Sequence, residues 1–183
     1  MKFTQAKIPG LIICQPFKIN DERGFFTESF RKDLFENFLG SKINFCQENL
    51  SNSNYGVLRG LHFQIEPFAQ SKLVSVLKGK ILDVVIDLRK SSKYFCQSFK
   101  IELDDIDCKQ LFIPKGFAHG FVVLSKTARV CYKVDNYYNP KSERGLNYND
   151  PTFGINWKVD EKSIIINEKD KSYPPFESNY FFD

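Results

Sequence analysis

The feature that most constrains the fold is a dense succession of short β-type runs. From about Val57 onward, apolar segments alternate with turn residues, and no helical periodicity separates them. The expected strands are Lys72–Leu77, Ile81–Leu88, Phe99–Leu103, Leu111–Ile113, Phe121–Leu124 and Val130–Val134. Short strands that follow one another without helices pair as antiparallel sheets, which form sandwiches or barrels. The sequence therefore predicts an all-β protein, and the 15% content of aromatic residues favours the same class.

One short helix and one tail are expected outside these strands. Five apolar residues recur at helical spacing and are followed by the stop residue Gly40, namely Phe30, Leu34, Phe35, Phe38 and Leu39. After about Trp157 the chain is polar and carries Pro174-Pro175, which is typical of a tail that wraps the surface. A length of 183 residues suits one domain, spanning 1–183.

Charge and cysteine usage exclude several classes of function. The net charge of +4 comes from basic residues spread along the chain, which is too weak for nucleic-acid binding but suits a small anionic ligand. No apolar run approaches the length of a membrane helix, and the N-terminus lacks a signal peptide, so we expect a cytoplasmic protein without a membrane partner. Five cysteines, odd in number and without a Cys-x-x-Cys pair, indicate neither a disulfide framework nor a zinc ribbon.

The two histidines, His62 and His119, are the natural candidates for proton chemistry near neutral pH. The segment Pro114–His119 has the Pro-x-Gly-x-x-His form of the second cupin motif, which feeds a histidine into the mouth of a β-barrel. A metal-binding cupin also needs a His-x-His pair on an earlier strand, where this chain has only His62. Two histidines do not complete a three-imidazole site, so we expect no metal. The predicted fold is a cupin-type β-jelly-roll barrel with a short N-terminal helix and a C-terminal wrapping tail.

A longer series of motifs follows in order along the chain. They are Asp21–Glu28, Gln47–Ser51, Gly56–Gln64, Gln70–Val74, Ile113–Phe121, Tyr132–Lys133, Tyr137–Tyr138, Glu143–Gly145, Asn149–Pro151 and Glu168–Asp170. This series resembles the dTDP-4-dehydrorhamnose 3,5-epimerase family from about residue 8 to residue 171. The resemblance implies epimerisation of dTDP-4-dehydro-6-deoxy-D-glucose at C3 and C5, without metal or cofactor, in the biosynthesis of dTDP-rhamnose for lipopolysaccharide, O-antigen or capsule.

The chemistry so implied needs a base and an acid on opposite sides of the sugar. A 4-keto group acidifies the hydrogens on C3 and C5, so a base removes one and an acid returns a proton to the other face. By the resemblance, His62 is the base, and Asp170 holds its tautomer by a hydrogen bond. Tyr132 is the acid, on a strand whose alternation places Val130 and Val134 on the same face. For each, a core or surface residue is the competing interpretation.

Two further expectations concern the centre of the site. Lys72 is expected to stabilise the negative charge that an enolate places on the C4 oxygen. Strict strand alternation puts Arg59 and His62 on opposite faces, so both enter one cavity only if the backbone bulges. Gly60 between them permits this, and we predict a bulge or sharp twist there.

The resemblance also implies a set of substrate contacts. Arg23 and Arg59 are expected at the diphosphate, because guanidinium groups match phosphate geometry. His119 and Lys169 are expected close to the substrate, and Phe26 and Tyr138 against the nucleotide. The polar contacts are assigned to Glu28, Gln47, Asn49 and Glu143. Members of the family are homodimers whose N-terminal strands cross to the partner, and the strand at 23–28 is compatible with such exchange.

Some features depart from the family pattern and leave alternatives open. Glu48 stands where the family often has Asp, and Ile65–Ala69 has its own composition. Val123 replaces the usual Asn of the cupin motif. Relatives that act on one carbon, or on another nucleotide sugar, carry much the same histidine and tyrosine. The alternatives are therefore a 3- or 5-epimerase, a non-catalytic nucleotide-sugar-binding cupin, and a metal-dependent cupin oxygenase or isomerase.

Overall fold

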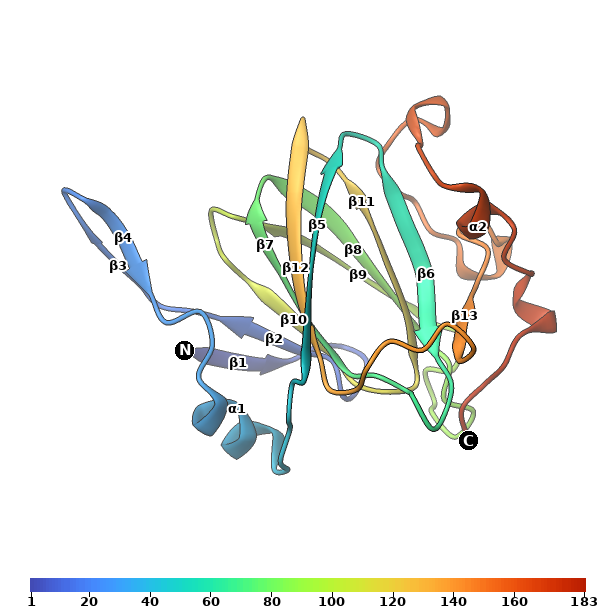
Figure 1. The fold of residues 1–183 in the computed structure, drawn as a ribbon, viewed down its shortest axis with the longest axis horizontal. Helices are drawn as coiled ribbons and strands as arrows, with labels where there is room; N and C mark the ends of the chain where they lie inside the picture. Colours follow the sequence, from blue (N-terminus) through green and yellow to red (C-terminus); the bar gives the residue numbers. More distant parts are fainter.

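Two antiparallel sheets face one another across an apolar core (Figure 1). The computed structural model describes residues 1–183. The larger sheet has the strand order β1-β2-β10-β7-β12-β5, and the smaller has the order β13-β6-β11-β8-β9. All pairings in both sheets are antiparallel. The predicted all-β jelly-roll architecture is confirmed.

The elements have the following bounds. The strands are β1 (Lys2–Gln5), β2 (Ile12–Gln15), β3 (Lys18–Asp21), β4 (Gly24–Thr27), β5 (Gln47–Asn54), β6 (Leu58–Gln64), β7 (Lys72–Lys78), β8 (Lys80–Asp87), β9 (Ser98–Asp104), β10 (Gln110–Ile113), β11 (Phe117–Val123), β12 (Thr127–Val134) and β13 (Glu143–Gly145). The helices are α1 (Lys32–Leu39) and α2 (Glu168–Lys171), with short 3-10 turns at Pro151–Phe153, Glu161–Ser163 and Phe176–Ser178. None of these helices has the length and apolar character that crossing a membrane requires.

Alternate residues of strand β8 belong to the two apolar clusters on its two faces. Ile81 and Val85 point into the core between the sheets, whereas Leu82 and Val84 belong to a second cluster on the outer face. That outer cluster includes Trp157, so the C-terminal tail covers the face that would otherwise meet solvent. A strand buried on both faces appears in the sequence as a continuous apolar run, which is the pattern of this segment.

The expected strands correspond to β7 to β12, whereas β1, β2 and β5, which precede Val57, were not predicted. Strands β1 and β2 join the edge of the larger sheet, and β5 pairs with β12 along its full length. The segment Gln47–Asn54 is rich in Asn, Gln and Ser, which have low β propensity. Its strand conformation is therefore imposed by pairing with β12.

The N-terminal helix is confirmed, with its glycine stop. Helix α1 ends at Gly40, which adopts the left-handed conformation at φ 73° and donates its amide to the carbonyl of Glu36. Phe35 on its buried face packs edge-on against Phe112 of β10, with ring centroids 5.0 Å apart. The helix thus covers the outer side of the larger sheet near β2 and β10. The tail adds the short helix α2, which periodicity did not predict.

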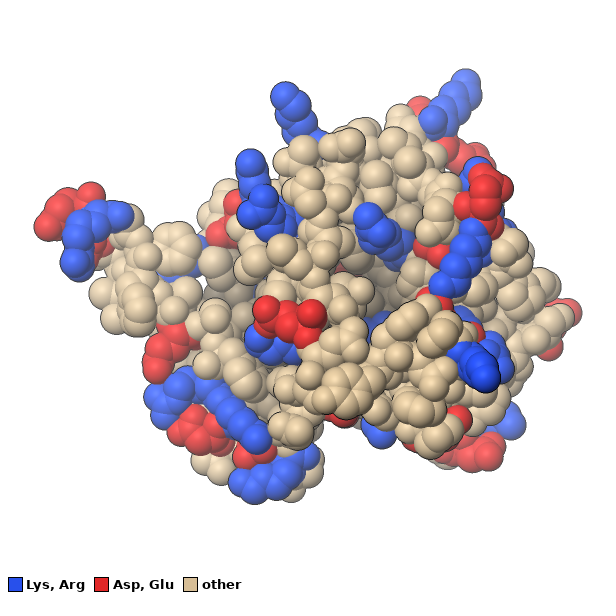
Figure 2. All heavy atoms as spheres, viewed as in Figure 1, with Lys and Arg blue, Asp and Glu red and all other residues tan.

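A hairpin formed by β3 and β4 projects away from the two sheets (Figure 1). Its strands pair with each other and with no other strand. Figure 2 shows charged side chains at its tip and uncharged atoms along its stem. Ile19 and Phe26 are about two-thirds exposed on this hairpin, with relative accessibilities of 65% and 66%. We call residues 17–27 the arm.

Candidate active site

A β-bulge in β6 determines where the side chains of Arg59 and His62 point. His119 of β11 pairs with His62, but the next pairing joins Phe121 to Arg59, so β6 holds one extra residue there. Gly60 sits in the bulge at φ 126°, and a Cβ on it would lie 2.5 Å from the Cα of Gly120. Arg59 and His62 consequently line the same cavity. The predicted bulge at Gly60 is confirmed, and a side chain is excluded by close approach of β11.

His62 is held by a buried carboxylate. Its Nε2 lies 2.9 Å from Oδ1 of Asp170, which is only 1% exposed. The other carboxylate oxygen accepts the Gly60 amide at 3.0 Å, and Asn167 accepts the amide of Asp170 at 2.7 Å. Burial alone would raise the pKa of Asp170, but the hydrogen bonds from His62 and Gly60 outweigh it and the net pKa is lowered.

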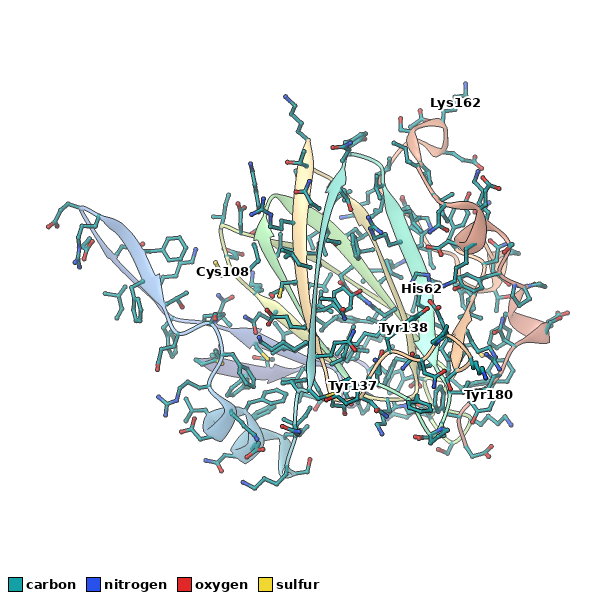
Figure 3. The ribbon with its side chains drawn as sticks, in the orientation of Figure 1. His62, Cys108, Tyr137, Tyr138, Lys162 and Tyr180 are labelled. Carbon is teal, nitrogen blue, oxygen red and sulfur yellow. The ribbon has the colours of Figure 1, made fainter.

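The ionised carboxylate fixes the histidine tautomer. Asp170 accepts a hydrogen bond from Nε2–H of His62, so in the neutral imidazole Nδ1 carries the free lone pair. Figure 3 shows His62 on β6 near the middle of the molecule, with Tyr138 beside the same pocket. His62 has the features of a general base: a free nitrogen, partial exposure to a cavity, and a partner that stabilises the imidazolium.

Tyr132 faces His62 from the opposite sheet. It lies on β12 of the larger sheet, packs partly against the inner core as Val130 does, and lines both cavities that His62 lines. Burial raises the pKa of Tyr132, while the cation of Arg59 opposes that rise. The phenol is therefore protonated at neutral pH and can donate.

Lys72 is the first residue of β7, and its side chain lies between His62 and Tyr132. Its Nζ has one protein hydrogen bond, to the carbonyl oxygen of His62 at 3.4 Å. Burial lowers the pKa of Lys72 to about 8, although the carboxylates of Asp83 and Glu143 oppose the change. An ammonium with free donors in a buried cavity is suited to stabilising an oxyanion.

A second histidine–aspartate pair lies directly beside the first. His119 is the cross-strand partner of His62, and its Nε2 lies 2.9 Å from Oδ2 of Asp83 on β8. Asp83 is fully buried, and its Oδ1 has no hydrogen-bond partner. The two pairs give neighbouring imidazoles whose Nε2 atoms are both engaged. His119 also lines the cavity that Arg59 and His62 line, as expected for a residue near the substrate.

The cavity has two lobes that share His62, Lys72 and Tyr132. The larger lobe, of about 240 Å³, is lined in addition by Gln47, Asn49, Phe63, Gln64, Gln70, Tyr138 and Glu143. The smaller lobe, of about 140 Å³, is lined in addition by Ser51, Arg59, His119, Phe121, Asn167 and Asp170. The three shared residues therefore stand where the lobes meet.

Glu143 joins two of the expected substrate contacts at the mouth. It accepts hydrogen bonds from the Tyr138 hydroxyl at 2.6 Å and from Lys169 Nζ at 2.5 Å. Burial alone would raise the pKa of Glu143, but these two donors bring the net pKa down. Burial likewise disfavours the charged form of Lys169, yet Glu143 raises its pKa to about 12. Lys169 and Glu143 are therefore a charged pair at neutral pH.

Three expected residues are not brought to the cavity of their own chain. Arg23 and Phe26 lie on the arm, and the Arg23 side chain is 83% exposed and bonded to Asp21. Glu28 follows the arm and binds Arg31. The structure brings together all the other predicted catalytic and binding residues.

Several residues around the cavity were not among the predicted site residues. Asp83 had a signal, because it is a lone acid within the apolar run of β8. Ser51, Gln64 and Gln70 also had a signal, because they lie within the ordered motifs, whereas Asn167 had none, since isolated polar residues are common on surfaces. Their position at the cavity follows from the packing of the two sheets and the tail.

The chain contains no cluster of three or more His, Cys, Asp or Glu residues that could hold a metal ion. Both histidines have one nitrogen committed to an aspartate. All five cysteines are free. That the reaction needs no metal stays a prediction.

A cupin-type barrel whose cavity sets a His–Asp pair against a tyrosine and a lysine defines an acid–base enzyme of sugar or carbonyl chemistry. A sequence model described as dTDP-4-dehydrorhamnose 3,5-epimerase matches residues 5–178. The epimerase of Shigella flexneri is 43% identical over 182 residues, covering 99% of both sequences. The chain belongs to the dTDP-4-dehydrorhamnose 3,5-epimerase family and is an isomerase.

Solved structures agree with this assignment. The dTDP-4-dehydrorhamnose 3,5-epimerase of Elizabethkingia anophelis matches with a TM-score of 0.94 and 44% identity, over 98% of this chain and 99% of that one. The dTDP-6-deoxy-D-glucose-3,5-epimerase of Legionella pneumophila, solved in complex with dTDP-4-keto-L-rhamnose, matches with a TM-score of 0.92 and 42% identity, over 97% and 93% of the chains.

Proposed function

We propose that the enzyme converts dTDP-4-dehydro-6-deoxy-D-glucose to dTDP-4-dehydro-L-rhamnose by inverting C3 and C5. The observation that carries the proposal is the placement of His62 and Tyr132 on opposite sheets, facing one cavity. Inversion requires removal of a proton from one side of the sugar and its return from the other. The Legionella pneumophila relative, solved with dTDP-4-keto-L-rhamnose, supports this substrate class.

His62 removes the proton from the carbon next to the keto group. Its free Nδ1 accepts the proton, and the buried carboxylate of Asp170 stabilises the imidazolium that forms. The side chain is partly exposed, so the base is regenerated by exchange of its proton with solvent. One base can thus act at C3 and then at C5 after the sugar ring shifts.

Lys72 stabilises the enolate between the two proton transfers. Electrons from the broken C–H bond move to the C4 oxygen, which becomes negative. The Lys72 ammonium stands where the two lobes meet and has donors left for that oxygen. A preorganised cation in a buried cavity lowers such a barrier by several kcal/mol. Tyr132 then donates its phenolic proton to the carbon, the C4 carbonyl re-forms, and the tyrosinate is reprotonated by solvent.

The remaining polar residues bind the nucleotide part. Arg59 contacts the diphosphate, and Gln47, Asn49 and Tyr138 contact the nucleotide from the larger lobe. Glu143 holds Tyr138 and Lys169 at the rim. The positive charge of Arg59 complements the two negative phosphates, whereas the charge of Lys169 is paired with Glu143.

The enzyme works as a homodimer in this proposal. The strands of the arm pair only with each other, and the arm exposes Ile19 and Phe26. An exposed hairpin with apolar side chains gains stability by pairing with a second copy. The arm of one protomer then brings Arg23, Phe26 and Glu28 to the cavity of the other. A cytoplasmic location stays a prediction from the sequence.

The test is solvent exchange at the two carbons. The enzyme is incubated with dTDP-4-keto-6-deoxyglucose in D2O, and deuterium at C3 and C5 is followed by NMR, with His62→Ala and Tyr132→Phe as controls. We expect deuterium at both carbons and a loss of roughly 10²–10⁴-fold in the His62→Ala variant. Deuterium at one carbon only would replace the double epimerase by a 3- or 5-epimerase. Absence of exchange at both carbons would refute the proposed catalysis.

A further inference from the structure

Tyr173 of the C-terminal tail contacts the base His62 but is not itself one of the reacting groups. Its ring meets the imidazole nearly edge-on, with centroids 5.6 Å apart and planes at 75°. Such a T-shaped arrangement is a favoured geometry for aromatic pairs. Asp170, three residues earlier in the chain, bonds Nε2 of the same imidazole. One short segment of the tail therefore touches His62 twice, by a hydrogen bond and by an aromatic ring.

The space for this ring is provided by a glycine. Gly145 of β13 is the cross-strand partner of His62, and a Cβ on it would lie 2.4 Å from the nearest ring carbons of Tyr173. The side chain of a cross-strand partner normally packs beside its neighbour. Here the ring of Tyr173, from a distant part of the chain, occupies that place.

The hydroxyl of Tyr173 takes no part in this contact. It is buried and has no hydrogen-bond partner, and Tyr173 does not line either lobe of the cavity. Burial, together with the negative charge of Glu143, raises the pKa of Tyr173 to about 12. A neutral, unpartnered hydroxyl outside the cavity supplies neither a proton nor a contact to the substrate. The useful part of Tyr173 is its ring.

We propose that Tyr173 is a positioning residue for the base, because its ring holds the His62 imidazole in the plane that aims Nδ1 at the cavity. A single hydrogen bond at Nε2 leaves the imidazole free to swing about that bond, whereas contact with a second ring removes this freedom. Proton abstraction depends steeply on such alignment. This inference rests on the proposed function, in which His62 takes the proton from C3 and C5.

Four variants test the role of the ring. Tyr173→Phe keeps the ring and should retain kcat within about twofold, whereas Tyr173→Ala should lower kcat roughly tenfold and leave KM within about twofold. Gly145→Ala should push the ring away and lower kcat to a similar extent. The double variant Gly145→Ala with Tyr173→Ala should be no slower than Tyr173→Ala, because the added methyl group then has space.

A spectroscopic readout separates positioning from simple stability. With only two histidines in the chain, ¹⁵N-labelled imidazoles give two sets of NMR signals, and His119 serves as an internal reference. We expect Tyr173→Ala to shift or broaden the His62 signals and to leave those of His119 unchanged. Tyr173→Phe should keep both sets as in the wild type.

Specific outcomes would overturn the inference. It fails if Tyr173→Ala keeps wild-type kcat, if its His62 signals do not change, or if Tyr173→Phe loses as much activity as Tyr173→Ala. A wild-type enzyme without deuterium exchange would instead refute the proposed function. In that case the NMR comparison still reports whether Tyr173 orders the imidazole, so the two failures are distinguishable.

Discussion

Asp83 is the residue whose burial is hardest to explain by stability alone. It is fully inaccessible, one of its oxygens has no partner, and its neighbours include a histidine and a lysine of the cavity. A buried carboxylate is costly unless it is paired. Its negative charge raises the pKa of Lys72 against the effect of burial. Asp83 therefore helps keep Lys72 in the charged form that an enolate oxygen needs.

The pH dependence of kcat/KM should report this interaction. Lys72, with a pKa of about 8, is an ammonium below that pH and neutral above it, so kcat/KM should fall as pH rises through about 8. Asp83→Asn removes the charge that raises this pKa, so the alkaline limb should move to lower pH by roughly 0.5–1 unit, equivalent to about 1 kcal/mol.

The matched control for that measurement is Asp87→Asn. Asp87 lies on the same strand and is equally buried, but it bonds Arg89 and Ser92 and not the cavity residues. Its substitution should leave the alkaline limb in place. If both variants move the limb equally, the charge of Asp83 has no specific effect on Lys72.

At the scale of elements, the short helix α2 connects the tail to the chemistry. Asn167 caps this helix by accepting the amide of Asp170, and Asp170 in turn bonds His62 and the bulge at Gly60. A four-residue helix has little stability of its own. Its cap and its contacts with β6 therefore hold the carboxylate at the correct distance from the base.

Removal of this cap should affect both stability and catalysis. Asn167→Ala should lower the free energy of unfolding by about 1 kcal/mol and also lower kcat, because Asp170 loses a fixed position. Asp160→Ala is the control, since Asp160 caps the turn Glu161–Ser163 in the same way but lies away from the cavity. Urea unfolding and steady-state kinetics measure the two effects. Equal kcat in the two variants would contradict the role assigned to the cap.

At the scale of the whole molecule, the arm is the part whose exposed apolar residues are not accounted for by a single chain. The two sheets and the tail bury their apolar faces, whereas the arm exposes Phe17, Ile19, Phe25 and Phe26 on a hairpin that pairs only with itself. A two-stranded hairpin is marginally stable alone in water. These features are accounted for by the proposed dimer, in which a second chain covers the arm.

A charge on the arm should separate the protomers and weaken substrate binding. Phe26→Glu should convert a dimer to a monomer in analytical ultracentrifugation and raise KM roughly tenfold or more, because the same residue is expected at the nucleotide. Ile165→Glu is the control, as Ile165 is also well exposed, at 57%, but lies in the tail. If Phe26→Glu leaves both the mass and KM unchanged, the arm has neither role.

Much of the candidate site could be predicted from sequence because its residues lie in ordered local motifs. The density of short apolar runs determined the two-sheet fold, since alternating or continuous apolar segments leave few other ways to bury their surface. Helix α1 followed from its period and from Gly40. The need for a bulge at Gly60 followed from strand alternation together with the expectation that Arg59 and His62 line one cavity, because these residues are three positions apart.

Only the tertiary structure decided which distant residues meet. Asp83 and Tyr173 reach the two cavity histidines, and Asn167 reaches Asp170, through the packing of β8 and the tail. No local pattern distinguishes a polar residue that will be buried from one on a surface. Strand β5 is extended because β12 pairs with it, against the preference of its own residues. Local sequence thus determined helix α1, strands β7 to β12 and the reacting groups. Long-range packing determined what orients those groups and holds their charges, because burial and contact depend on segments far apart in the chain.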